Sequence, residues 1–287
     1  MAHNPRTFEP SFMVIRNIAL CCFVIVCLVV SIPHSSSAQL ISHGDLFGPG
    51  APPPLFGVEL GFGSHKQQGV YQAACKCDFP EGSGTGFMGS LVFELPVTYE
   101  WVLGLKGGID FKNTFSRVSI SDTATIRFPR PIQGDSVTTG VITFDRLGTV
   151  KTTYLTFSPF VQYQFFRLGP FIQAGLGVSI LIANHFTHQR ELTSSTVTPL
   201  NGTPIQNLRF ENGTLDETLQ DGPITDARGL RLGALLGVGY DISMNERAVI
   251  APMITLDLPL TTIRDPLATG WKMQSIFASI ELKYKLN

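Results

Sequence analysis

The sequence lacks any long apolar run after its first forty residues. A membrane-spanning helix needs about 20 consecutive, mainly apolar residues, and no stretch beyond residue 38 approaches that length. Any later part of the chain that crosses a membrane must do so as strands, because a closed β-barrel is the other backbone arrangement that satisfies its hydrogen bonds in lipid. An excess of basic residues is also missing, since 21 lysines and arginines face 22 acidic residues. Nucleic-acid binding, which needs a basic patch, is therefore not indicated.

Cysteine is scarce too, and three of the five cysteines lie within the first 38 residues. The remaining pair, Cys75 and Cys77, either closes a strained disulfide in an oxidising compartment or stays partly reduced. A zinc site needs three or four ligands held together. The close spacing of His185 and His188 supplies only two. We therefore predict no metal site and no cofactor.

The first 38 residues have the layout of a secretory signal peptide. Arg16 precedes an apolar run over residues 18–32, Pro33 ends it, and small residues stand at positions −3 and −1 of a cleavage site after Ala38. The alternative is an uncleaved anchor helix, for which a run of about 15 residues is short. We predict a signal peptide over residues 1–38, followed by a periplasmic N-terminal segment over residues 39–54.

Apolar residues alternate with small or polar residues in eight segments of the remaining chain. In the sixth segment, Leu236 and Val238 share one face, whereas Gly237 and Asp241 share the other. This period of two is typical of strands. The eight segments are residues 55–65, 86–97, 101–113, 151–166, 170–184, 229–242, 248–260 and 273–286.

The connections between these segments alternate between short and long. Short turns join the second to the third segment, the fourth to the fifth and the sixth to the seventh, whereas the other connections, such as residues 114–150 and 181–228, are long. An even strand count with short turns on one side is the outer-membrane pattern. The predicted fold is all-β: an eight-stranded antiparallel up-and-down transmembrane β-barrel over residues 55–287, with periplasmic turns and long extracellular loops.

Charged residues occupy the face that would point into such a barrel. Charges of both signs in a confined space should pair, because an unpaired buried charge is costly. An ion-pair plug is therefore the favoured interpretation, and a proton or ion path is the alternative. Ten inward glycines either allow bulky neighbours to pack closely or leave a small hydrophobic cavity. The predicted lumen network is Glu59, Glu94, Lys106, Asp110, Lys112, Arg231, Asp241, Asp257, Glu281, Lys283 and Lys285.

Aromatic residues gather beside the predicted short turns, where an interfacial girdle would lie. They are Trp101, Tyr163, Phe165 and Tyr240. Two prolines, Pro159 and Pro252, fall inside predicted strands, where each removes a donor from the ladder. The strand register is less well defined at these two positions.

Two stretches carry a resemblance to a known family. "SPFVQYQFFRLGPFIQAGLGV" (residues 158–178) resembles the strand-turn-strand of PorT-like bacterial outer-membrane β-barrel proteins. "IFASIELKYKLN", at the end of the chain, is similar to the terminal strands that barrel-assembly machinery recognises. The resemblance implies residence in the bacterial outer membrane, contact with its lipid and assembly through the C-terminal strand. It implies little about activity.

The favoured function is that of an integral outer-membrane barrel with a plugged, narrow lumen and a structural, adhesive or partner-binding role for its surface loops. The second hypothesis is a narrow channel or carrier for small hydrophobic solutes, which requires a continuous cavity. The third is a lipid-modifying enzyme, which requires a contact between a nucleophile and a histidine near the outer rim. No such contact is evident in the sequence, so we expect no enzymatic activity.

Overall fold

The computed structural model describes residues 53–73, 77–128, 136–166, 168–193, 209–210, 213–264 and 270–286. Side chains are not described for residues 122–141 of the longest hairpin. The predicted signal peptide over residues 1–38 lies outside the described residues, as does most of the segment 39–54. Within the described ranges, no helix is long and apolar enough to cross a membrane.

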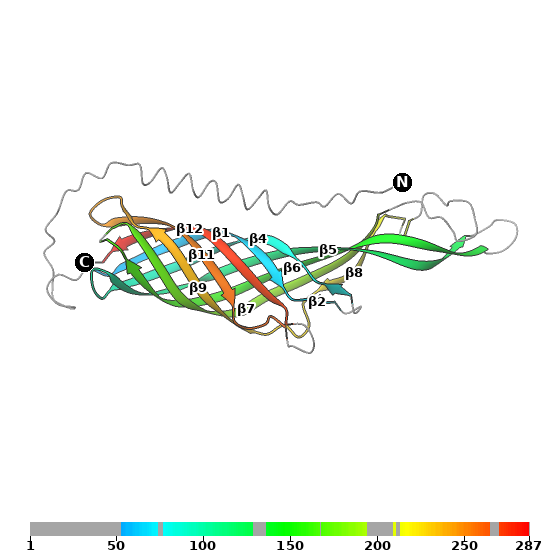
Figure 1. Cartoon of the computed structure of the whole chain (residues 1–287), viewed down its shortest axis with the longest axis horizontal. Helices are drawn as coiled ribbons and strands as arrows, with labels where there is room; N and C mark the ends of the chain where they lie inside the picture. Colours follow the sequence, from blue (N-terminus) through cyan, green and yellow to red (C-terminus); the bar gives the residue numbers. More distant parts are fainter. Residues whose placement is uncertain are drawn as a thin grey trace.

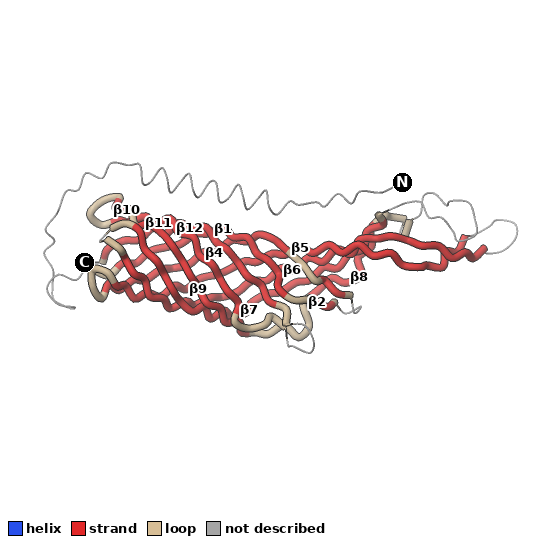
Figure 2. Tube along the Cα trace, viewed as in Figure 1, coloured by secondary structure: helices blue, strands red, loops and turns tan. Residues whose placement is uncertain are grey.

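Eight antiparallel strands form a closed ring, in which each strand pairs with two neighbours (Figures 1 and 2). The ring closes because β9 pairs with both β7 and β11, and β12 pairs with β1. The predicted eight-stranded up-and-down barrel is thereby confirmed. Its strands are β1 (Leu55–Gln68), β4 (Ser83–Pro96), β5 (Trp101–Phe128), β6 (Ser136–Gln164), β7 (Pro170–Leu192), β9 (Leu230–Tyr240), β11 (Ala248–Pro259) and β12 (Lys272–Lys285).

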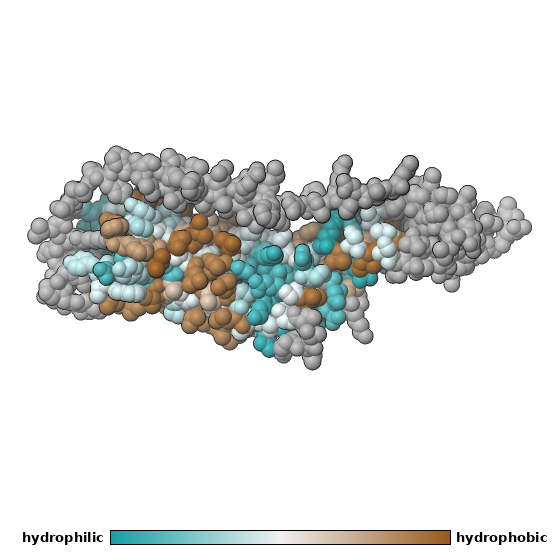
Figure 3. Space-filling view, in the orientation of Figure 1, coloured by the Kyte–Doolittle hydropathy of each residue, from teal (hydrophilic) through white to brown (hydrophobic). Residues whose placement is uncertain are grey.

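The barrel turns its apolar side chains outward. Leu236 and Ile280 are 49% and 53% exposed, whereas their strand neighbours Arg231 and Glu281 are 3% and 1% exposed. Figure 3 shows hydrophobic side chains gathered over the barrel wall. A soluble barrel has the opposite arrangement, and an apolar outer band around a polar interior is the pattern of a transmembrane barrel.

Two of the segments predicted to be long loops instead contain paired strands, so this part of the prediction is wrong. Residues 114–150 are largely strand, because β5 and β6 stay paired from Thr114–Val150 out to Phe128–Ser136. Within residues 181–228, β7 continues to Leu192 and pairs with β8 (Asp216–Gly222). Beyond the barrel, β5 keeps an apolar alternation, with Val118 and Ile120 on one face and Arg117 and Ser119 on the other, whereas the matching parts of β6, β7 and β8 show no regular apolar alternation.

We call the part of β5, β6, β7 and β8 that lies beyond the barrel the projecting sheet, comprising residues 115–128, 136–149, 185–192 and 216–222. It extends one end of the barrel along its long axis (Figure 1). The opposite end, at the turns after β4, β6 and β10 (Ile242–Ser243), is the short-turn end.

A hydrophobic cluster packs across the projecting end of the barrel. Tyr71 of β2 (Tyr71–Gln72) lies 4.6 Å from the ring of Phe186 and 4.8 Å from that of Trp271. The connections β1–β4, β8–β9 and β11–β12 meet there, since Arg264 donates to the Gln72 carbonyl at 2.6 Å. This mouth cluster consists of Tyr71, Ala73, Cys77, Phe79 (of β3, Asp78–Phe79), Val150, Phe186, Ile224, Ile263, Trp271 and Met273.

Candidate functional site: the charged lumen

Ten of the eleven predicted lumen charges are buried inside the barrel, each at most 8% exposed. They come from β1, β4, β5, β9, β11 and β12, with Asp241 directly after β9. The eleventh, Lys285, is a correction. It lies at the short-turn end, partly exposed, and donates to the Glu246 carbonyl at 2.8 Å. Its inward position on the strand is too close to the end of β12 for its side chain to reach the lumen charges.

Lys283 sits among three carboxyl groups at the short-turn end of the lumen. Its Nζ lies 2.9 Å from Glu94 Oε1, 2.9 Å from Asp241 Oδ1 and 3.4 Å from Glu281 Oε2. None of these four residues is more than 4% exposed. One ammonium group therefore joins β4, β12 and the residue that follows β9.

Lys106 continues this group toward the middle of the barrel. Its Nζ is 2.5 Å from Glu281 Oε1 and 3.2 Å from Glu59 Oε2. The hydroxyl groups of Ser90 and Ser279 donate to the two oxygens of Glu59 at 2.9 and 2.7 Å. This short-turn cluster thus places four carboxyl groups around two lysines. Its members are Glu59, Glu94, Lys106, Asp241, Glu281 and Lys283.

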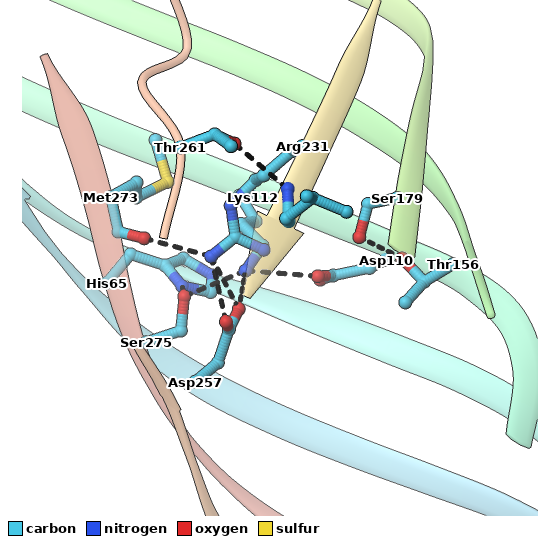
Figure 4. A network of polar contacts seen from close by, with 11 residues as sticks. His65, Asp110, Lys112, Thr156, Ser179, Arg231, Asp257, Thr261, Met273 and Ser275 are labelled. Atoms are coloured by element: carbon cyan, nitrogen blue, oxygen red, sulfur yellow. Dashed lines mark hydrogen bonds and ion pairs between the residues drawn. The ribbon is translucent and has the colours of Figure 1, made fainter. Parts of the chain in front are cut away.

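A second group, the central cluster, lies nearer the projecting end (Figure 4). Arg231 Nη2 donates to both oxygens of Asp257 at 2.8 Å. Lys112 Nζ lies 2.7 Å from Asp257 Oδ2 and 3.1 Å from Asp110 Oδ2. Two cations and two carboxylates balance one another here. Removing one partner of such a buried pair costs more than the pair itself contributes, because it leaves an uncompensated charge.

One contact between a nucleophile and a base was missed from the sequence. His65 Nδ1 lies 2.8 Å from Ser275 Oγ, and Lys112 Nζ donates to the same oxygen at 2.9 Å. The two residues are 210 positions apart, but they are direct partners in the register of β1 and β12. The only feature of the sequence that could have indicated this contact is that both residues occupy inward-facing positions of their strands. Both side chains are 1% exposed, so the pair lies inside the wall and not at an outer rim.

The inward glycines mostly make room for aromatic rings. A Cβ at Gly104 would come within 2.1 Å of the Phe160 ring, and one at Gly239 within 2.3 Å of the Phe171 ring. Gly177 differs, because the nearest atom to a Cβ there would be 3.7 Å away, on Leu235. Packing and a cavity, which the sequence left as alternatives, therefore both occur.

The predicted girdle residues lie together at the short-turn end. The rings of Trp101 and Tyr163 are 5.0 Å apart and those of Tyr163 and Phe165 are 5.3 Å apart. Tyr240 pairs with Pro170 next to the turn that follows β6. Trp101 is 47% exposed on the outer wall.

The remaining predicted residues lie at the other end. Cys77 is disulfide-bonded and buried in the mouth cluster, whereas Cys75 lies outside the described residues. His185 Nε2 lies 2.7 Å from Asp221 Oδ1. The ring of His188 packs against that of Phe79, with 5.2 Å between the ring centroids. In the part of the chain that the structure describes, no group of three or more His, Cys, Asp or Glu side chains could hold a metal ion.

Burial shifts two titratable groups at this end. It raises the pKa of the Tyr71 hydroxyl to about 12. It also lowers the pKa of His188, to which the nearby Arg146 and Arg190 add repulsion of the imidazolium. Burial and the two arginines therefore favour the neutral form of His188 at the junction of the mouth cluster and the projecting sheet.

A closed ring of eight strands, apolar outside and charged inside, is the architecture of an outer-membrane β-barrel. A comparison with family models agrees: residues 55–264 match the outer membrane protein beta-barrel domain, and the chain belongs to that family. The protein is thus an integral protein of the bacterial outer membrane.

A comparison with solved structures gives matches of low sequence identity and low TM-score. Ail, the attachment invasion locus protein of Yersinia pestis, is 10% identical with a TM-score of 0.31, covering 80% of this chain and 99% of Ail. OprG from Pseudomonas aeruginosa is 13% identical with a TM-score of 0.29, covering 83% of this chain and 98% of OprG. The P. putida toluene transporter TodX is 7% identical with a TM-score of 0.23, covering 84% of this chain and 91% of TodX. No curated protein matches the sequence.

Proposed function

We propose that this outer-membrane barrel is a non-enzymatic platform that presents the projecting sheet outside the cell for adhesion or partner binding. The observation that carries this proposal is the continuity of β5, β6 and β7 from the barrel into the sheet. An irregular loop of the same length could connect the barrel strands without continuing their backbone pairing. Because the strands are shared, the orientation of the sheet follows from that of the barrel.

The chemistry of the sheet suits a surface held in water. Opposite charges pair across neighbouring strands, an arrangement that stabilises a sheet. β8 pairs with β7 on one side, and no described strand pairs with its other side. A free edge of this kind offers backbone N–H and C=O groups to an extended segment of a partner. The cross-strand pairs are Arg117–Asp145, Arg190–Glu217 and His185–Asp221.

The lumen serves structure in this proposal. The short-turn cluster, the central cluster and the mouth cluster lie one after another along a barrel that eight strands already make narrow. We expect little or no steady conductance when the purified protein is inserted into planar bilayers. Large, stable single-channel steps would instead favour a narrow channel.

Orientation can be tested on intact cells with a membrane-impermeant maleimide. Ser121→Cys, in the projecting sheet, should be labelled without permeabilisation. Met244→Cys, which is 61% exposed at the short-turn end, should be labelled only after the outer membrane is permeabilised. The reverse labelling pattern would overturn the proposed orientation.

Presentation can be tested by shortening the sheet without touching the barrel. Ser121 and Thr143 are direct partners, so residues 121–143 can be replaced by a two-residue turn that leaves the Arg117–Asp145 pair in place. The shortened chain should reach the outer membrane in normal amounts, while cells carrying it lose surface attachment and cell–cell aggregation. Unchanged attachment would contradict the proposed role.

Three further features complete the proposal. The leader over residues 1–38 directs export, the strand β12 engages the barrel-assembly machinery, and within the family the chain belongs to a PorT-like group. The alternation of "IFASIELKYKLN" supports the second, and residues 158–178 support the third. N-terminal sequencing that finds residues before Ile32 in the mature protein would rule out the export leader.

A further inference from the structure

A cavity of about 70 Å³ lies in the middle of the lumen, in contact with both charged clusters. Glu59 and Lys106 of the short-turn cluster line it on one side, and Arg231 and Asp257 of the central cluster line it on the other. Apolar side chains complete the lining, among them Met88, Leu235 and Phe277. The cavity is therefore neither a purely polar hydration site nor a purely apolar void.

Four buried polar atoms around this cavity have no hydrogen-bond partner among the described residues. They are Asp110 Oδ1, Gln173 Oε1, Arg231 Nε and Thr255 Oγ1. All four residues are at least nine-tenths buried. Leaving a buried donor or acceptor unpaired costs about 1–3 kcal/mol in general. The arrangement thus offers hydrogen bonds of both kinds to a molecule in the cavity.

The ladder between β6 and β7 is interrupted beside the cavity. The two strands pair at Phe157–Val178 and again, in the same register, at Phe160–Gly175, but the two residues between on each strand form no ladder pair with each other across this seam. Pro159 has no N–H to donate. Ser158 and Gly177 line the cavity, whereas Leu176, 56% exposed, faces outward. At this point the outer surface is separated from the cavity by two short stretches of backbone that pair with β5 and β9 but not with each other.

We propose that the cavity binds a small amphipathic molecule, such as a short-chain alcohol, that enters from the bilayer between β6 and β7. A cavity of about 150 Å³ holds benzene, so this one accepts a smaller molecule. Its apolar part contacts Met88 and Leu235, and its hydroxyl bonds Thr255 and Gln173. The entrance rests on the proposed plugged lumen, in which the charged clusters and the mouth cluster close the two axial routes and leave the seam. The binding site itself is independent of the proposed presentation role.

The binding site can be tested by NMR in lipid nanodiscs with ¹³C-methyl methionine and 1-butanol as the probe. The Met88 methyl signal should shift saturably as butanol is added. Gly177→Val fills the cavity and should abolish the saturable shift. Gly107→Val is the matched control, because Gly107 faces outward beside Phe157 and should leave binding unchanged. A linear, unsaturable shift, or equal binding by Gly177→Val, would overturn the site.

Thr255→Val provides a second measurement that keeps the side-chain volume. Removing one hydrogen-bonding hydroxyl should weaken butanol binding roughly three- to tenfold. Binding of the same strength in this variant would contradict the role of the unpaired polar atoms. It would also indicate that the cavity selects only by size.

The entrance is tested separately by closing the seam. Pro159 and Leu176 occupy opposite positions between the two flanking pairs, so Pro159→Cys with Leu176→Cys can form a cross-link. Oxidation should slow the exchange of butanol at least tenfold, and reduction should restore it. The unmodified chain under the same treatment controls for the native disulfide. Unchanged exchange in the oxidised form would refute the side entrance while leaving the site itself intact.

Discussion

Removing Lys283 is the sharpest test of the charged lumen. Its ammonium group is the shared partner of Glu94, Asp241 and Glu281, all within 3.4 Å and all almost fully buried. Lys283→Ala leaves four carboxyl groups with Lys106 as their only remaining cation in the cluster. Breaking one buried ion pair typically costs about 3–5 kcal/mol. We expect a loss of unfolding free energy in this range, at its upper end because three pairs break together.

The control for this variant lies two residues away on the same strand. Lys285 has the same inward parity but is partly exposed and donates to a turn carbonyl. Lys285→Ala should therefore cost no more than about 1 kcal/mol. Adding Glu94→Gln to Lys283→Ala should recover part of the loss, since it removes one of the stranded charges.

Guanidinium unfolding from lipid vesicles measures these changes, and the chain contains two tryptophans that report on different ends. Trp101 is on the outer wall at the short-turn end, whereas Trp271 is buried in the mouth cluster. Single-tryptophan versions would show whether both ends unfold together, which a two-state comparison requires. If Lys283→Ala and Lys285→Ala destabilise the barrel equally, the short-turn cluster does not hold it together.

Three other outcomes follow from the structure. Leu236→Arg, on the lipid-facing wall, should destabilise the barrel by about 2–4 kcal/mol in bilayers, and no penalty would mean that the wall does not face lipid. Because the folded protein lowers the pKa of His188 below its usual 6.5, the unfolded chain binds the proton more readily, and acidification from about pH 7.5 to 5.5 should weaken the base of the projecting sheet. Hydrogen exchange of β7 and β8 measures this, and an identical pH dependence in His188→Gln would exclude His188 as its source. Arg264→Ala should open the mouth cluster and expose Trp271 to acrylamide quenching, whereas Arg247→Ala, at the opposite end, should not.

The barrel was predictable because its strands carry a strong two-residue period. Outward leucines, isoleucines and valines alternate with inward glycines and charges from Leu55 to Lys285. The inward orientation of Glu59 and Arg231 could be predicted directly from their positions in this alternation. Lys285 did not, because parity says nothing about where a strand ends or how far a side chain lies from the lumen axis.

The projecting sheet was missed for a physical reason. Beyond Thr114, β5 still alternates, with Val118 and Ile120 opposite in parity to Arg117 and Ser119, but the part of β6 before Val150 carries no regular alternation that would predict its pairing. Backbone pairing continues there although only one of the two strands carries the hydrophobic signal. The mouth cluster and the His65–Ser275 contact were out of reach as well, because they join residues up to 210 positions apart. Only the closure of the ring brings them together.

The shared strands of the barrel and the projecting sheet also have a mechanical consequence. A pull on the tip of the β5–β6 hairpin, directed away from the membrane, runs along the strand axes (Figure 1). Both strands of the hairpin are then pulled in the same direction, and the ladders that hold them to β4 and to β7 lie across that direction. Such a load shears many bonds of these ladders at once and cannot peel them off singly. A partner attached at the tip would then detach from the sheet before the hairpin gave way, with the force carried into the wall of the barrel.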